Sequence, residues 1–336
     1  MSELRDADAG RCGWNAPEMA RDPSWLEVFT PQELAALDEA LRHFKAAGKP
    51  VMDMAKADFP VGPLQARLDR LVTELRSGRG FVVLRGLPVT DYSDEDVGIL
   101  FYGLGLYIGR PLKQNPRGDL LGHVFDQGQA FGKMDVRGSQ TNAFLPFHSD
   151  SSEIVGLLCL RPAKSGGLSS VSSVVSVYHD LERSHPELLA PLAEGYQYIR
   201  REIAMGDTPV TRHPVPVFGV ADEVVSCRLV PTQIEAAAKK LGRPIEGLKR
   251  TALDTLNALT ADDRYRLDMD LRRGDIQFVN NYVVLHSRSE YEDYPEPERK
   301  RHMLRLWLAF DREWPLADGF ARRLGYEGDR VVEVYD

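Results

Sequence analysis

Cysteines are scarce in this sequence: Cys12, Cys159 and Cys227 are the three present among 336 residues, and they lie far apart. An odd number of scattered cysteines does not make a disulfide framework and favours a reducing compartment. An apolar signal-peptide core is also lacking, because residues 2–8 are polar, and every apolar run is far shorter than a membrane-spanning helix requires. We therefore expect a cytoplasmic protein with no membrane partner.

The sequence has no excess of positive charge. Its 42 Lys and Arg residues are outnumbered by 50 Asp and Glu residues, so the net charge is -8 and gives no electrostatic reason to expect a nucleic-acid partner. The basic cluster at residues 299–302 is short and typical of a solvated loop edge. A hydrophobic content of 43% is ordinary for a globular protein with a sizeable core. A homo-oligomer is possible, but one chain does not determine it.

A histidine and an aspartate two residues apart, His148 and Asp150, are the first sign of a function. On an extended segment such a pair projects from one face, where an imidazole nitrogen and a carboxylate oxygen can bind one metal ion. The same spacing occurs at His185 and Glu187, but Pro186 between them is more typical of a helix start. The alternative for His148 and Asp150 is a buried, hydrogen-bonded pair at a strand end.

A metal site needs a third ligand, and the best candidate is His286 at the end of the apolar segment 276–286. His123, His213 and His302 are its rivals. The alternative for His286 itself is a hydrogen-bonded histidine of the core.

Arg305 is a lone cation in the apolar segment 303–308, which reads as a strand. A guanidinium cannot lose its charge and therefore needs an anion when it is buried; its planar fork suits a carboxylate. The alternative is an internal salt bridge. Arg301 falls on the same face by alternation, but its charged neighbours predict that it lies in a loop or at the exposed end of the strand.

The order His-x-Asp, distant His and late-strand Arg resembles the TauD/TfdA family of Fe(II)/2-oxoglutarate dioxygenases. The resemblance runs from about residue 80 to about residue 310. It includes residues 80–86, the Gly166-Gly167 turn and Gly274-Asp275 before the distal histidine. No single motif is specific, and the order and spacing together carry the match. The match around Gly274-Asp275 favours His286 over its rivals as third ligand.

The resemblance implies roles for particular residues. The iron ligands would be His148, Asp150 and His286, and the distal carboxylate of 2-oxoglutarate would bind Arg305 and Ser169. Ser170, Ser172 and Ser173 stand close by as alternatives to Ser169. Two histidines and one carboxylate leave coordination positions open, as non-haem Fe(II) oxygenases require.

The function implied is oxidation of a small-molecule substrate with Fe(II), 2-oxoglutarate and O2, releasing succinate and CO2. We expect hydroxylation. Desaturation, epimerisation or cyclisation with the same cofactors is one alternative, and a non-catalytic metal-binding jelly roll is another. The residues with which taurine-type members hold a sulfonate do not map onto this sequence, so taurine itself is not predicted.

The expected fold is α+β, with a double-stranded β-helix (jelly-roll) core flanked by helices. We expect a helical N-terminal extension at residues 1–79, the catalytic domain at residues 80–315 and a C-terminal tail at residues 316–336. A long insertion at about residues 174–265 would interrupt the catalytic domain. The Gly-rich, polar residues 126–139 before the metal pair are a candidate lid, and a plain surface loop is equally consistent.

Several elements have local signals of their own. Thr30 and Glu33 form a capping-box pattern before a helix that ends at Gly48, and Ser93 is the cap of a helix reaching Gly109. Helices are also expected at residues 231–241 and about 245–259, and a strand at residues 196–201.

Overall fold

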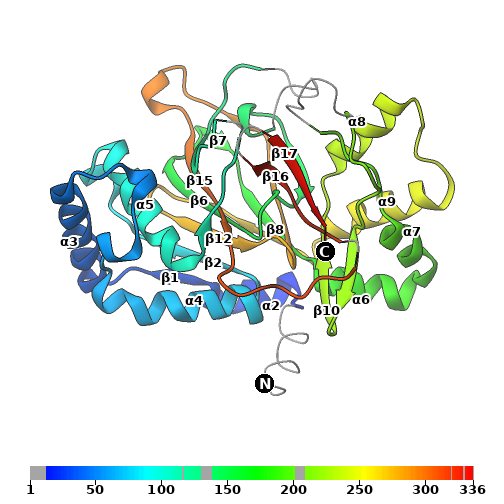
Figure 1. Ribbon diagram of the computed structural model, residues 1–336, viewed down its shortest axis with the longest axis horizontal. Helices are drawn as coiled ribbons and strands as arrows, with labels where there is room; N and C mark the ends of the chain where they lie inside the picture. Colours follow the sequence, from blue (N-terminus) through cyan, green and yellow to red (C-terminus); the bar gives the residue numbers. More distant parts are fainter. Residues whose placement is uncertain are drawn as a thin grey trace.

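The computed structural model describes residues 13–115, 117–129, 138–200, 209–318 and 320, together with two strands after residue 320. This part of the chain is a mixed α+β structure: strands occupy the centre and helices lie on either side (Figure 1). No helix within it is long and apolar enough to cross a membrane.

Two sheets form the centre. The larger has seven strands in the order β1 (Leu26–Val28), β2 (Phe81–Arg85), β12 (Ile276–Asn280), β6 (Ile154–Arg161), β15 (His302–Ala309) and β3 (Arg110–Pro111), with β4 (Leu121–Val124) also paired to β15. The smaller has the order β11 (Arg266–Met269), β8 (Ser169–Ser173), β13 (Val284–Arg288) and β5 (Leu145–His148). Neighbouring strands are antiparallel, except that β1 runs parallel to β2.

Three short two-stranded ribbons complete the described strands. They are β7 (Ser165–Gly166) with β14 (Tyr291–Glu292), β9 (Phe218–Ala221) with β10 (Val224–Cys227), and β16 (Ala321–Glu327) with β17 (Arg330–Tyr335). The helices are α2 (Ala16–Arg21), α3 (Pro31–Ala47), α4 (Gln65–Ser77), α5 (Asp94–Ile108), α6 (Val174–Ser184), α7 (Leu189–Glu194), α8 (Pro231–Leu241) and α9 (Gly247–Thr260).

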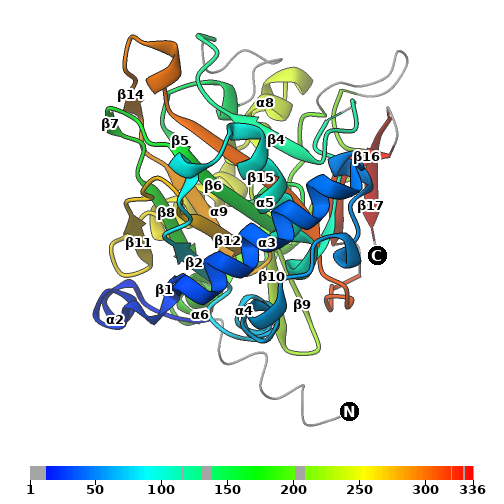
Figure 2. The same cartoon turned by 90° about the vertical axis from the view of Figure 1, so that its left-hand side faces the viewer.

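Helices α3, α4 and α5 cover one side of the strands, and α6 to α9 gather on the other (Figures 1 and 2). The predicted capping box is confirmed, since Thr30 Oγ1 accepts from Glu33 N and the Glu33 carboxylate accepts from Thr30 N. Ser93 caps α5 in the same way by accepting from Asp96 N. These local hydrogen bonds satisfy backbone donors that the first turn of a helix leaves unpaired.

Two further helix predictions are confirmed, and one strand prediction is wrong. The helix at residues 231–241 is confirmed as α8, and α9 matches the helix expected at about residues 245–259. The strand expected at residues 196–201 is wrong over its described part, residues 196–200, where Tyr196 and Ile199 form only isolated bridges; residue 201 lies outside the described residues. Of the candidate lid, residues 130–137 lie outside the described residues.

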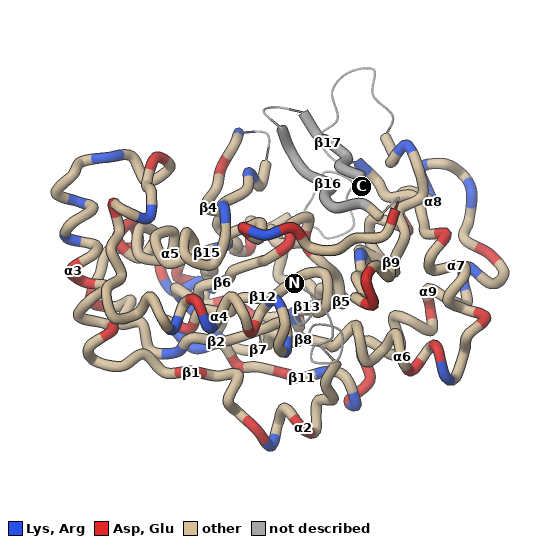
Figure 3. The backbone as a smooth tube through the Cα atoms, turned by 60° about the horizontal axis from the view of Figure 1, so that its bottom comes forward, with Lys and Arg blue, Asp and Glu red and all other residues tan. Residues whose placement is uncertain are grey.

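Positively and negatively charged residues are interspersed along the described chain (Figure 3). Several form exposed pairs, such as Lys164 with Glu292 and Arg42 with Asp38. Exposed pairs of this kind contribute little to stability.

Gly274 is required where the chain enters β12. Its φ is +83°, and a Cβ added there would lie 2.0 Å from the carbonyl oxygen of Leu87. We expect Gly274→Ala to lower the free energy of unfolding by about 2 kcal/mol or more, because it combines an unfavourable backbone conformation with a backbone clash. Gly242→Ala is the matched control, since Gly242 has φ +63° but open space around it. Urea unfolding measures the free energy of unfolding of both variants. If Gly274→Ala lost no more stability than Gly242→Ala, the clash with Leu87 would be relieved without cost.

Candidate metal centre

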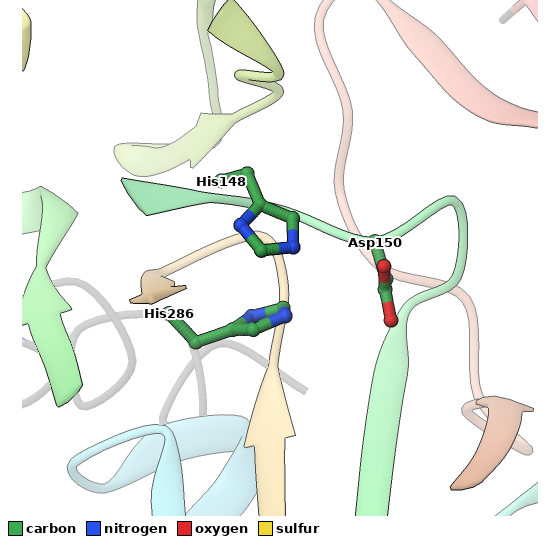
Figure 4. Close-up of side chains that lie close together, drawn as sticks. All are labelled: His148, Asp150 and His286. Atoms are coloured by element: carbon green, nitrogen blue, oxygen red, sulfur yellow. The ribbon is translucent and has the colours of Figure 1, made fainter. Parts of the chain in front are cut away.

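His148 and His286 are brought together by strand pairing. They are directly opposite each other on the antiparallel strands β5 and β13 of the smaller sheet. Opposite residues of an antiparallel pair project from the same face, so the two imidazole rings meet, with centroids 4.4 Å apart. Figure 4 shows the rings one above the other, each with a nitrogen directed toward Asp150.

Asp150 follows β5 and is held on both its backbone and its side chain. Its backbone N–H donates to Asn281 Oδ1 at 3.0 Å, and its carbonyl accepts from Arg228 Nη1. Its Oδ2 accepts from Trp307 Nε1 at 2.8 Å and from Arg305 Nη1 at 3.4 Å. Both of these donors come from β15 of the larger sheet, so the site lies between the two sheets.

The protonation states suit metal binding. Burial lowers the pKa of His148 and lowers that of His286 to about 3, so both imidazoles are neutral at physiological pH and keep a lone pair. Burial acts to raise the pKa of the Asp150 carboxyl, but the opposing effect of nearby charges, chiefly Arg305, brings it down to about 2. Asp150 is therefore ionised.

The three residues fit a non-haem iron. Their ligand atoms lie within 4.8 Å of one another, and the described residues contain no other such group of His, Cys, Asp or Glu. His148 Nδ1 is 2.8 Å from the carbonyl oxygen of Pro146, which holds the ring proton there and leaves Nε2 as the ligand atom. His286 Nδ1 is buried and has no hydrogen-bond partner among the described residues. Trp307 and Arg305 both donate to Asp150 Oδ2, so Oδ1 of the same carboxylate stays available for a metal ion.

A cavity of about 210 Å³ opens beside the three ligands. Asp150 is the one acidic residue in its described wall, whereas four arginines line it: Arg200, Arg288, Arg301 and Arg305. Such a wall attracts anions, as expected for a co-substrate with two carboxylates.

Arg305 lies in this cavity on the same face of β15 as Met303 and Trp307, as the alternation predicted. Its guanidinium stacks on the Trp307 ring at 4.6 Å, and its Nε donates to Gln114 Oε1 at 2.8 Å. With Asp150 Oδ2 also 3.4 Å away, part of its charge is already balanced by a protein carboxylate. Its role as co-substrate ligand remains a prediction.

The expectation that Arg301 is exposed is wrong. Its residue exposure is 6%, and its side chain lines the same cavity as Arg305. Burial lowers the pKa of the Arg301 guanidinium, and its Nη1 has no hydrogen-bond partner. Arg301 immediately precedes β15, and its side chain lines the cavity with Met303 and Arg305 of that strand despite its charged sequence neighbours.

Ser169 is the one serine of β8 that lines the cavity among those considered. It is directly opposite Arg288 on β13, and its hydroxyl donates to Gln277 Oε1 at 3.1 Å. Ser170 instead donates to Asp268, and Ser173 caps α6.

The rival histidines lie elsewhere. His302 is hydrogen-bonded to His123 and to Arg161, both at 2.9 Å, and burial lowers its pKa to about 4. A guanidinium beside an imidazole disfavours a bound cation. His213 is exposed.

A comparison with known proteins agrees with this site. The chain matches the family described as "Taurine catabolism dioxygenase TauD, TfdA family" over residues 39–307. The chain belongs to this family. It is therefore a dioxygenase that uses Fe(II), 2-oxoglutarate and O2 to oxidise a small molecule.

Individual proteins are also similar to this chain in sequence or in fold. The FR-33289 synthase of Streptomyces rubellomurinus is 30% identical over 319 residues, covering 93% of this chain and 94% of that protein. Asparagine oxygenase with Fe(II), 3-hydroxyasparagine and succinate has a similar fold, with a TM-score of 0.67 and 20% identity over 85% of this chain and 93% of that one. The non-heme iron oxygenase OrfP, solved with Fe and alpha-ketoglutaric acid, has a TM-score of 0.62 and 18% identity over 85% and 94% of the two chains.

The sequence did not assign Arg228 or Asn281 to the support of Asp150 in this dioxygenase site. Arg228 is 1% exposed, between the apolar Cys227 and Leu229, so the reasoning applied to Arg305 would have found it too. Asn281, fully buried, donates from Nδ2 to the Ser152 carbonyl while holding Asp150 N. Six residues near the ligands were considered for the substrate pocket (Gln140, Asn142, Phe147, Asn281, Tyr282 and Arg288), and of these only Arg288 lines the cavity in the described structure.

Proposed function

We propose that the protein hydroxylates its small-molecule substrate at an iron held by His148, Asp150 and His286. The observation that carries this is the convergence of the three ligand atoms within 4.8 Å at the wall of an arginine-lined cavity. When bound, Fe(II) with 2-oxoglutarate and O2 supplies the oxidising equivalent that replaces a C–H bond by C–OH.

The surrounding residues prepare this site before any ligand arrives. Pro146 fixes the ring of His148 through its carbonyl, and Trp307 fixes the Asp150 carboxylate through Oδ2. Arg305 keeps that carboxylate ionised. Ligands held in this way are preorganised for the metal, which increases affinity and fixes the open positions.

For the distal carboxylate of 2-oxoglutarate, we propose Arg301 together with Ser169. Arg301 is buried, lines the cavity and has an unpartnered Nη1, which a carboxylate would satisfy. Arg301 also lies close to the Gly166-Gly167 turn, which precedes Ser169: a Cβ added to Gly167 would be 3.3 Å from Arg301 Nε. Arg305, which the sequence predicted for this role, remains the alternative; its pairing with Asp150 makes it less available to a second anion.

The two central sheets support a double-stranded β-helix as the finer description of the fold. Their strands come from distant parts of the sequence and pair antiparallel, with the metal ligands between the sheets. We propose the division into an extension at residues 1–79, a catalytic domain at residues 80–315 with an insertion at about 174–265, and a tail at 316–336. Cytoplasmic location, the absence of a nucleic-acid partner and a possible homo-oligomer also remain predictions.

The function is tested by a metabolite screen with Fe(II), ascorbate, O2 and 2-oxoglutarate. We expect slow, iron-dependent formation of succinate without substrate, and a several-fold higher rate with the right one. The product should gain one oxygen atom in its mass spectrum; loss of two hydrogens would identify desaturation instead. If no iron-dependent succinate forms under any condition, the non-catalytic alternative is correct.

A further inference from the structure

Arg288 is a second buried arginine in the cavity wall. It follows His286 by two residues on β13, is 6% exposed and lines the cavity. Its Nη2 donates to the backbone carbonyls of Thr141, at 2.9 Å, and Ala143. Its Nε and Nη1 are buried and have no hydrogen-bond partner among the described residues. Nη2 of this guanidinium therefore holds the loop at residues 141–143, whereas Nε and Nη1 are buried with their hydrogen-bonding capacity unused.

Arg288 and Arg301 lie close together around one aromatic ring. Their guanidinium carbons are 4.8 Å and 5.0 Å from the centroid of Tyr291. Burial, and then the charge of Arg301, lower the pKa of Arg288 to about 10. Asp126 and Asp293 lie near enough to act in the opposite direction, but neither lines the cavity.

Two adjacent buried cations with three unsatisfied N–H positions are unfavourable unless an anion joins them. Asp293 does not serve as that anion, because its Oδ1 accepts from the backbone N–H of Arg301 and its Oδ2 has no partner in the described structure. The side that remains open to both guanidinium groups is the cavity itself. Ser169, directly across the sheet from Arg288, adds a hydroxyl to the same wall.

We propose that Arg288 is a positioning residue that joins the distal carboxylate of 2-oxoglutarate to the segment 138–144. This rests on the proposed co-substrate site at Arg301 and Ser169. The carboxylate accepts from the unsatisfied side of Arg288, and Nη2 of the same group holds the carbonyls of residues 141 and 143. Binding of 2-oxoglutarate thereby stabilises this segment.

The segment matters because its first residues form a wall of the cavity. Gly138 and Ser139 line it directly, and Leu145 and Pro146 continue the wall into β5 and His148. A co-substrate that orders this wall prepares the place for the substrate. The substrate should consequently bind more tightly when 2-oxoglutarate is already bound. By thermodynamic linkage, bound substrate should increase the affinity for 2-oxoglutarate by the same factor.

Two measurements without turnover test this coupling. Anaerobic titration of the Fe(II) protein gives the affinity for 2-oxoglutarate, and hydrogen exchange followed by mass spectrometry gives the protection of residues 138–144. In the native protein, saturating 2-oxoglutarate should slow exchange there several-fold. Arg288→Gln should weaken 2-oxoglutarate binding about tenfold or more, since it removes a charged hydrogen-bond donor, and should abolish the added protection even at saturation.

Two further variants separate this role from a merely structural one. Arg301→Gln should weaken 2-oxoglutarate binding but keep the added protection once the site is saturated, because Arg288 is intact. Arg288→Lys keeps a positive charge but lacks the planar guanidinium. It should therefore bind 2-oxoglutarate more tightly than Arg288→Gln does, but should still lack the added protection of residues 138–144. Circular dichroism confirms that each variant is folded.

The outcomes distinguish this inference from the proposed function. If native protein fails to bind 2-oxoglutarate, the proposed function itself fails. Binding that leaves exchange in residues 138–144 unchanged overturns only the coupling. The coupling is equally overturned if Arg288→Gln keeps both the affinity and the protection of the native protein.

Discussion

Replacing His286 with alanine should abolish iron-dependent formation of succinate. The imidazole is one of three proposed ligands whose atoms lie within 4.8 Å of one another, and its removal leaves one histidine and one carboxylate, too few to hold Fe(II) firmly. Loss of an outer-shell partner alone typically lowers metal affinity by about 10- to 100-fold, so the loss of a ligand should lower it by at least about 100-fold. Titration with Fe(II) under anaerobic conditions measures the affinity, and succinate formation measures turnover.

His302→Ala is the matched control. His302 is a half-buried histidine that, like the buried His286, lies on a central strand, but it bonds to His123 and Arg161 and lies outside the group of three. Its replacement should leave iron affinity within about threefold of the native value, consistent with a loss below about 1 kcal/mol. If His286→Ala bound iron and turned over normally while His302→Ala did not, the third ligand would be His302.

Much of the metal centre was predictable because its signals are local. A strand presents every second residue on one face, so His148 and Asp150 had to be considered together. The distal ligand needed more, because no local rule says which strand pairs with β5; the family resemblance supplied His286. The structure then brings all three together through the register that opposes His286 to His148.

Helix ends were predictable for a similar reason. The Thr30 and Glu33 capping box and the Ser93 cap involve groups only three residues apart, and the structure contains both. The strand at residues 196–200 failed because its apolar pattern was read without a partner, and only isolated bridges form there. A strand exists only where another segment supplies its hydrogen bonds, and that information is not local.

Arg301 illustrates a conflict between two local signals. Alternation placed it on the cavity face with Arg305, whereas the charged run around it suggested solvent. The structure agrees with the face that alternation gave, because Arg301 lines the same cavity as Met303 and Arg305, although it precedes β15 and a register shift lies between His302 and Met303. Arg288 was seen only as a possible pocket residue, since its bonds to residues 141 and 143 span about 145 positions of the sequence.

The 2-oxoglutarate site can be assigned by comparing Arg305 of β15 with Arg301, which immediately precedes that strand. We expect Arg301→Gln to raise the dissociation constant of 2-oxoglutarate at least about thirtyfold, the change that corresponds to about 2 kcal/mol. Loss of one partner from a desolvated charge pair costs roughly 2–5 kcal/mol, and Arg301 is buried with an Nη1 that has no hydrogen-bond partner in the described structure. The measurement is an anaerobic titration with 2-oxoglutarate at saturating Fe(II).

Arg305→Gln is the comparison that decides the assignment. Arg305 already balances the charge of Asp150, so its loss should act mainly on the metal ligand and change the 2-oxoglutarate constant by less than about tenfold. Saturating iron in both titrations removes any indirect effect through metal affinity. A larger effect for Arg305 than for Arg301 would show that Arg305 binds the distal carboxylate, as the sequence alone predicted. Small effects for both would mean that the distal carboxylate binds neither Arg301 nor Arg305, and Arg288 would then be the remaining cation opposite Ser169.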